Sequence, residues 1–174
     1  MSELIKPRVP RLIIGISGAS GAIYGVRLLE LLQDTSIETH LVVSKSALIT
    51  LAHETELSWS QLKGLADVSY SNQDIGAAIA SGSFKTMGMV IAPCSVRSMS
   101  EIASGVTSTL LTRAADVVLK ERRRLVLMVR ETPLHRNHLR SMSELAELGA
   151  VIAPPVPAFY AKPSSLEEMV DHTL

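Results

Sequence analysis

Short apolar runs alternate with amphipathic segments along most of the chain. The apolar runs predict five buried strands, at residues 12–16, 40–43, 87–92, 125–129 and 150–153. Within each run the apolar residues are nearly continuous, which is typical of parallel strands that helices cover on both faces. Between the runs, apolar residues recur at helical spacing, as at Ala22, Val26 and Leu29. This alternation predicts an α/β fold with an open, doubly wound parallel sheet, arranged as a three-layer sandwich.

The rest of the chain carries weaker signals. We expect helices at 135–148 and 165–174, and short helices near 59–65 and 74–80. Residues 1–10 hold two prolines and no apolar core, so we expect a flexible tail there and no signal peptide. At 174 residues and without a linker-like segment, the chain fits one domain over 1–174.

Composition and charge exclude several classes of protein. Apolar residues make up 47% and charged residues 20% of the chain, as in ordinary globular proteins. Seventeen basic and seventeen acidic side chains cancel, so no net field would attract nucleic acid or an anionic membrane surface. No apolar stretch approaches the roughly 20 residues that span a bilayer. The single cysteine, Cys94, cannot form an internal disulfide and suits a reducing compartment, so we expect a cytoplasmic protein.

Each predicted strand is followed by polar or turn-forming residues. These segments are Ser17–Gly21, Ser44–Lys45, Pro93–Ser98, Arg130–Glu131 and Pro154–Tyr160. Ligands of open α/β sheets bind outside the carboxyl ends of the strands. The five segments therefore predict one binding cleft along that edge of the sheet.

The first of these loops runs directly into a predicted helix. Its glycines allow close backbone approach to a ligand, and the unpaired amides of the helix N-terminus favour an anion. It is not a Walker A loop, because no lysine occurs between Lys6 and Lys45, and it lacks the G-x-G-x-x-G spacing. The loop suits a single phosphate, as in a mononucleotide, or else it is a strand–helix turn without a ligand.

Charged residues suggest two further hypotheses. Arg113, Asp116 and Lys120 share one helix face, which is either a solvated face with an Asp116–Lys120 pair or a cationic wall for a phosphate. Arg130 and Glu131 directly follow a buried strand, and that position favours a role in the site over a structural ion pair.

Thiol and metal chemistry are not indicated. Cys94 at a strand end is typical of a small, buried apolar side chain. His135 and His138 share a helix face, but no third ligand has the spacing of a metal site. We therefore predict no metal.

Seven sequence blocks carry a family resemblance. They are Gly15–Gly25, Ser44–Lys45, Glu54–Thr55, Pro93–Ser95, Arg113–Arg122, Arg130–Pro133 and Pro157–Tyr160. In this order they closely resemble the flavin prenyltransferases of the UbiX type, from about Arg11 to the final residue. The resemblance implies a flavodoxin-like, Rossmann-like fold that binds FMN and joins a dimethylallyl group from dimethylallyl phosphate to N5 and C6 of reduced FMN. It further implies that prenylated FMN passes to a UbiD-type decarboxylase, as in ubiquinone biosynthesis, and that the protein is a homo-oligomer, with a dodecamer expected.

The resemblance also assigns roles to individual residues. Expected FMN contacts are Gly18, Ala19, Ser20, Ser44, Ser95, Val96, Arg97, Ser98 and Arg130. Expected contacts to the prenyl phosphate are Arg113, Lys120 and Tyr160, and the expected catalytic residues are Ser20, Glu54, Glu131 and Lys120. Because the chain has no adjacent aspartates to bind magnesium, Arg and Lys would neutralise the departing phosphate. Glu131, with Ser20 or the released phosphate, would take the proton that the flavin loses.

The chain departs from the family pattern in two places. It ends at Leu174, within the last predicted helix, where family members continue and supply another arginine for the prenyl phosphate and an aromatic residue. Arg124 stands where proline is common in the family. Two other functions remain open: an FMN-dependent decarboxylase of the peptidyl-cysteine type, and a flavin carrier without chemistry.

Overall fold

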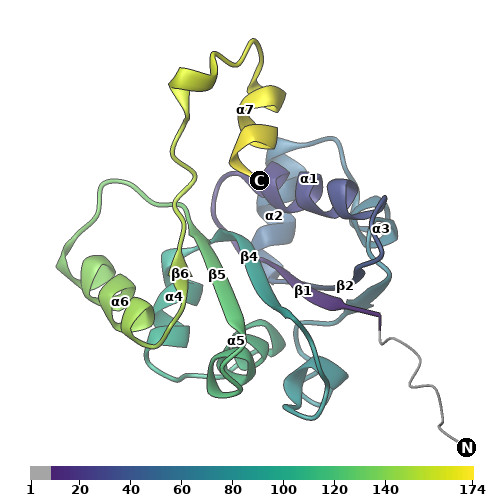
Figure 1. Ribbon diagram of the computed structural model, residues 1–174, viewed down its shortest axis with the longest axis vertical. Coiled ribbons are helices and arrows are strands. Elements are labelled where there is room, and N and C mark those ends of the chain that lie inside the picture. Colours follow the sequence, from purple (N-terminus) through teal and green to yellow (C-terminus); the bar gives the residue numbers. More distant parts are fainter. Residues whose placement is uncertain (1–8) are drawn as a thin grey trace, which may run out of the picture.

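Six parallel strands form one sheet, in the order β3-β2-β1-β4-β5-β6 (Figure 1). The structure is a computed structural model that describes residues 9–174. The strands are β1 (Arg11–Ile16), β2 (Glu38–Val43), β3 (Val68–Tyr70), β4 (Gly88–Cys94), β5 (Arg124–Val129) and β6 (Val151–Ile152). The order of the strands reverses between β1 and β4. In open parallel sheets, ligands bind at the carboxyl ends of the strands beside this reversal.

Helices pack on both faces of the sheet. One face carries α1 (Ala22–Leu32), α2 (Lys45–Glu54) and α3 (Trp59–Gly64), and the other carries α4 (Val96–Ala103), α5 (Leu110–Lys120) and α6 (Arg136–Glu147). Single 3-10 turns, η1 (Ala78–Ala80) and η2 (Phe159–Ala161), lie in the connections. The last helix, α7 (Leu166–Thr173), packs against α1, where Arg27 Nε lies 2.6 Å from Asp171 Oδ1 (Figure 1).

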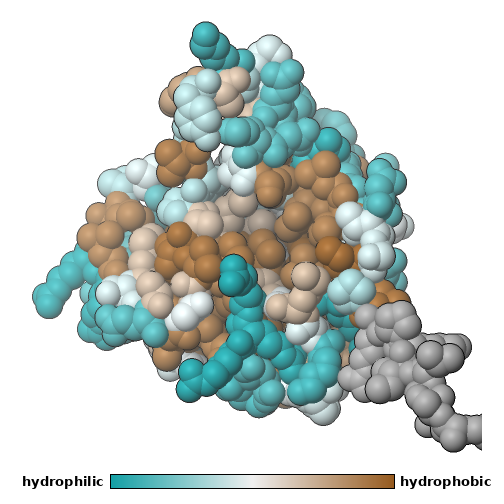
Figure 2. Space-filling view, in the orientation of Figure 1, coloured by the Kyte–Doolittle hydropathy of each residue, from teal (hydrophilic) through white to brown (hydrophobic). Residues whose placement is uncertain are grey.

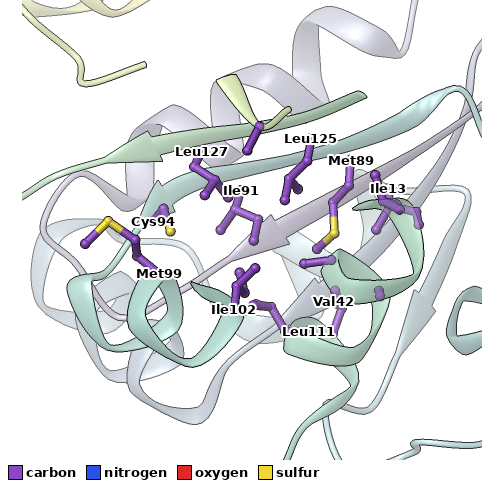
Figure 3. Packing of buried hydrophobic residues seen from close by; sticks show 14 of the residues in the cluster. Ile13, Val42, Met89, Ile91, Cys94, Met99, Ile102, Leu111, Leu125 and Leu127 are labelled. Carbon is purple, nitrogen blue, oxygen red and sulfur yellow. The ribbon is translucent and has the colours of Figure 1, made fainter. Parts of the chain in front are cut away.

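Two apolar cores lie on the two faces of the sheet because side chains alternate along each strand. Ile13 faces α4 and α5, while its neighbour Ile14 faces α1 and α2. In Figure 3, Ile91 and Leu127 of the strands point toward Ile102 of α4. All of these side chains are at most 4% exposed. Burial of each such side chain stabilises the fold by roughly 1.5–3 kcal/mol.

The predicted doubly wound parallel sheet is confirmed, and so are all five predicted strands. The predicted helices at 135–148, 165–174 and 59–65 are also present, as α6, α7 and α3. The predicted helix at 74–80 is wrong in extent, because only the single turn η1 forms there. The sequence did not predict β3, α2 or α4. Most of the predicted flexible tail at 1–10 lies outside the described residues.

Part of the sheet has no helix over it on the side of α1. Figure 1 shows β5 and β6 uncovered in this view, and Figure 2 shows apolar surface across the same part of the molecule. On β5, Leu125 and Leu127 belong to the core under α4 and α5, so Val126 between them points to the uncovered side. Val126 is half-buried, and Val151 of β6 is 43% exposed. An apolar sheet surface of this kind is typical of an interaction surface.

Candidate functional site

The loops after four strands are tied to one another at the carboxyl edge of the sheet. The Ser44 amide, after β2, donates to the Ile16 carbonyl of β1 at 2.9 Å. The Arg130 amide, after β5, donates to the Cys94 carbonyl of β4 at 3.1 Å. These bonds continue the sheet one residue beyond the strands. Residues predicted to form one cleft are therefore held side by side by backbone bonds.

Ser17 joins the two loops that flank the reversal in strand order. Its amide and its Oγ both donate to the Pro93 carbonyl at 3.1 Å, and its Oγ accepts from the Ser95 amide at 2.7 Å. The side chain is buried, so it cannot replace these partners with water. The sequence placed Ser17 in the polar loop without giving it a role, and its position between two loops is visible only in three dimensions.

Glu54, the last residue of α2, occupies the amides at the start of α1. Its Oε2 accepts from the Gly21 amide at 2.8 Å and from the Ala22 amide at 2.9 Å. Gly21 has φ 98°, a left-handed conformation that favours glycine. The sequence predicts that these amides bind the phosphate of a ligand. In the structure a carboxylate of the protein itself binds them, so a phosphate in this site needs other donors.

The charge of Glu54 is stabilised by its surroundings. Partial burial would raise its pKa, but hydrogen bonds from the Ser20 side chain and the Ala22 and Gly21 amides, with the nearby Arg130 guanidinium, outweigh that effect and lower the pKa. Glu54 is therefore ionised at neutral pH. Ser20, Glu54 and Arg130, which the resemblance placed in the site, lie together.

A cleft of about 290 Å³ opens between α2 and α4, next to the tied loops. Hydroxyl groups of Ser44, Ser46, Ser95, Ser98 and Thr109 line it. Lys45 and Arg97 contribute positive charge, although Arg97 Nε lies 3.0 Å from Glu101 Oε1. Hydroxyls and cations together suit a phosphate. The cleft therefore offers the donors that the start of α1 does not.

Gly18 allows the first loop to approach α2 closely, and two serines cap the helices that border the cleft. A side chain at position 18 would collide with the Ser46 side chain, so only glycine fits where the first loop approaches α2. Ser44 and Ser95 cap α2 and α4, accepting from the Ala47 amide at 3.1 Å and the Ser98 amide at 3.2 Å. Their hydroxyls thus serve the helices in this structure, and each also bonds a neighbouring serine: Ser95 Oγ donates to Ser98 Oγ at 3.2 Å, and Ser44 Oγ lies 3.1 Å from Ser46 Oγ. Ala19 belongs to the first loop, and Val96 is the first residue of α4.

Glu131 lies in the loop after β5, one residue beyond the tied Arg130. It follows Arg130 after β5, is exposed, and its Oε1 accepts from the Thr132 amide at 3.0 Å. A carboxylate there can accept a proton from a ligand bound beside Arg130.

The three expected phosphate contacts are not brought together within the chain. Tyr160 on η2 is 83% exposed, and its hydroxyl lies 3.3 Å from His172 Nε2. Arg113 pairs with Asp116 at 2.7 Å, so the predicted Asp116–Lys120 pair does not form. Lys120 pairs with Glu121 at 2.8 Å and is the last residue of α5, roughly 10 Å along the helix from Arg113 and near the amino end of β5.

Cys94 behaves as the sequence indicated. It is fully buried in the core under α4, and burial raises the pKa of its thiol to about 12. A thiol that stays protonated at neutral pH is a poor nucleophile.

Among residues 9–174, no three His, Cys, Asp or Glu side chains gather as metal ligands would. No helix in the same range is both long and apolar enough to cross a bilayer.

The chain resembles known proteins over nearly its whole length. It matches the Flavoprotein family over residues 3–173. Flavin prenyltransferase UbiX of Escherichia coli K12 is 62% identical over 165 residues, which are 94% of this chain and 87% of that protein. A crystal structure of AnUbiX in complex with FMN and dimethylallyl pyrophosphate has a TM-score of 0.94 at 46% identity, covering 95% of this chain and 88% of that one. A dodecameric FMN-dependent UbiX-like decarboxylase from Escherichia coli O157:H7 has a TM-score of 0.92 at 46% identity, covering 94% and 89%.

Proposed function

This chain belongs to the flavin prenyltransferases of the UbiX type, and we propose that it joins the dimethylallyl group of a prenyl phosphate to N5 and C6 of reduced FMN. N5 of the reduced flavin would displace the phosphate from the prenyl carbon. The prenyl double bond would then take up a proton, and flavin C6 would attack the resulting cation and lose its own proton as the ring closes. The observation that supports this most directly is the grouping of Ser20, Glu54 and Arg130 beside a hydroxyl-lined cleft, at the reversal of the sheet.

The residues at the carboxyl edge fit FMN. Ser44, Ser95 and Ser98 would donate hydroxyl protons to the FMN phosphate in the cleft, because Glu54 already occupies the amides of α1. The loop from Gly18 to Ser20, with Val96 and Arg97 of α4 and Arg130 after β5, would hold the rest of the molecule. The Arg130 guanidinium would favour negative charge on a reduced flavin.

Arg113, Lys120 and Tyr160 would bind and neutralise the departing phosphate. Lys120 lies at the opposite edge of the sheet from Ser20 and cannot reach it within one chain. A second copy of the chain would therefore supply Lys120 to the site. The uncovered apolar surface around Val126 and Val151 supports a homo-oligomer, and the dodecameric relative suggests twelve copies.

Proton removal would fall to Glu131. Its carboxylate is exposed in the loop after β5 and can accept the proton that the flavin loses as the second bond forms. Glu54 would hold the Ser20 loop and keep Ser20 directed by its hydrogen bond.

Anaerobic incubation with reduced FMN and dimethylallyl phosphate, followed by mass spectrometry of the flavin, tests the proposal. We expect a flavin heavier by one five-carbon prenyl unit. Unmodified flavin that co-purifies with the protein, with either dimethylallyl phosphate or the diphosphate as donor, would contradict the transferase and favour a flavin carrier. The FMN-dependent decarboxylase alternative is not favoured, because the relative at 62% identity is a prenyltransferase.

We further propose that the product passes to a UbiD-type decarboxylase in the cytoplasm. The protonated, buried Cys94 is compatible with a reducing compartment. Mass-spectrometric detection of prenylated FMN in an apo-decarboxylase incubated with this protein and its substrates would support the transfer.

A further inference from the structure

A second pocket of about 380 Å³ lies beside the cleft, at the carboxyl ends of β2 and β3. It opens between α2 and α3 and shares Lys45 and Asn72 with the cleft. The proposed reaction does not use its other residues. A volume of this size is within the range of small-molecule sites.

The pocket is positively charged. Lys45 of α2 and Lys63 of α3 line it, and none of its lining residues is Asp or Glu. Within residues 9–174, neither lysine has a carboxylate at ion-pair distance. Two ammonium groups without a counter-charge at one concave surface favour an anionic ligand.

An indole forms part of the wall. Trp59 is 39% exposed, and with Lys63 it lies at i and i+4 on one side of α3. The helix is held in place by a capping box between Ser58 and Gln61 and by Leu62, which is fully buried. Trp59 and Lys63 are thus presented by a fixed helix, and the indole offers a flat apolar surface to a ring.

The opposite wall is polar and fixed. The Tyr70 hydroxyl lies 2.9 Å from His40 Nδ1, which holds the phenol in place. Asn72 Oδ1 accepts from the Leu111 amide at 2.9 Å, and the Asn72 side-chain NH₂ makes no hydrogen bond within the described part of the chain. This amide can donate to a ligand without disturbing the start of α5.

We propose that this pocket binds a small aromatic anion, with its ring against Trp59 and its carboxylate or phosphate group between Lys45 and Lys63. The Asn72 amide adds a hydrogen bond to the same anionic group. The site is separate from prenyl transfer and goes beyond the proposed function. Its occupant is an effector or a second ligand next to the flavin cleft.

Trp59 is the single tryptophan of the chain, so its fluorescence reports on the pocket. Benzoate and phenyl phosphate are titrated against the purified protein, and calorimetry repeats the titrations with FMN-loaded protein. We expect saturable quenching by one or both probes, which identifies the anionic group. Cyclohexanecarboxylate, which lacks an aromatic ring, and benzyl alcohol, which lacks the charge, should bind at least tenfold more weakly.

Two substitutions and a matched control locate the site. Lys63→Gln should weaken binding of the preferred probe roughly tenfold, the loss of one charge-assisted hydrogen bond. Trp59→Leu should weaken it similarly in calorimetry, and Lys85→Gln, an exposed lysine before β4, should leave it unchanged. Prenyl transfer by both pocket variants should stay at the wild-type rate. Non-saturable quenching, displacement of FMN by the probe, or equal affinities in Lys63→Gln and Lys85→Gln would each overturn the proposal.

Discussion

The proposed site has two parts, and they are held in opposite ways. One part is the set of tied loops after β1, β2, β4 and β5, and the other is the segment after β6. The loops are fixed by bonds within the chain, such as the 2.7 Å bond from the Ser95 amide to Ser17 Oγ. The segment after β6 carries Tyr160 on a single turn that extends away from the sheet, 83% exposed (Figure 1). Lys120 lies farther from the loops, at the carboxyl-terminal end of α5.

This difference indicates which part of the proposed site a single chain forms and which part requires an oligomer. In the proposed assignment, one copy forms the FMN-binding loops, because the bonds that fix them lie within the chain. In the same assignment, the prenyl phosphate would be bound by Arg113, Lys120 and Tyr160, which a single copy does not bring together. Substitutions in the two parts should therefore affect different measurements.

The largest effect is expected for Glu131→Gln. If its carboxylate takes the flavin proton, the first-order rate of product formation should fall by about 10²- to 10⁴-fold. FMN affinity should be unchanged, because Glu131 makes its only described hydrogen bond to the adjacent Thr132 amide. Rapid-mixing assays with saturating FMN would measure the rate, and a wild-type rate would reject this role.

Lys120→Met should lower turnover by about 10²- to 10³-fold, the usual cost of removing one charge that stabilises a leaving group. The free energy of unfolding should hardly change, because the exposed ion pair between Lys120 and Glu121 contributes little to stability.

Mixed oligomers test whether Lys120 acts on the site of a neighbouring chain. Co-expressed Lys120→Met and Glu131→Gln chains should recover part of the activity that each variant alone lacks, because some sites combine an intact Glu131 with an intact Lys120 of a neighbour. Recovery would be absent if Lys120 acted on the site of its own chain.

Ser17→Val tests the tied loops. The valine methyl groups leave the Ser95 amide without its acceptor, so the free energy of unfolding should fall by about 1–3 kcal/mol. FMN affinity should fall as well, because the two loops lose their connection. Urea denaturation and FMN titration would measure both, with the exposed Ser104→Ala as a control expected to change stability by less than about 0.5 kcal/mol.

The sequence predicted most of the sheet because nearly continuous apolar runs are a strong signal for buried parallel strands. It missed β3, which has three half-buried residues and no such run. It also missed α2 and α4, because Ser44 and Ser95 were interpreted as ligand-binding residues, although a serine before a helix is equally an N-cap signal.

The site was predictable only in part, for a similar reason. The position of polar residues after strands identified the edge, since that rule depends on topology alone. The contact of Glu54 with Gly21 spans 33 residues, and no local pattern indicates it. The separation of Lys120 from Ser20 likewise follows from the direction of α5, which runs back toward the amino ends of the strands.

The smallest effect concerns the charge of Glu54 and its dependence on pH. Its pKa is lowered in the folded protein, so its stabilising contribution is complete above the ordinary glutamate value of 4.5 and is lost as the pH falls through the lowered value. The difference in unfolding free energy between wild type and Glu54→Gln should therefore be constant near neutral pH and shrink below about pH 4.5. Urea denaturation at several pH values measures it, with Glu56→Gln as the matched control, because Glu56 is exposed and accepts no hydrogen bond in the described structure. A difference that stayed constant down to pH 3 would mean that the contact with the α1 amides does not depend on the charge of Glu54, and that a neutral acceptor holds the Ser20 loop equally well.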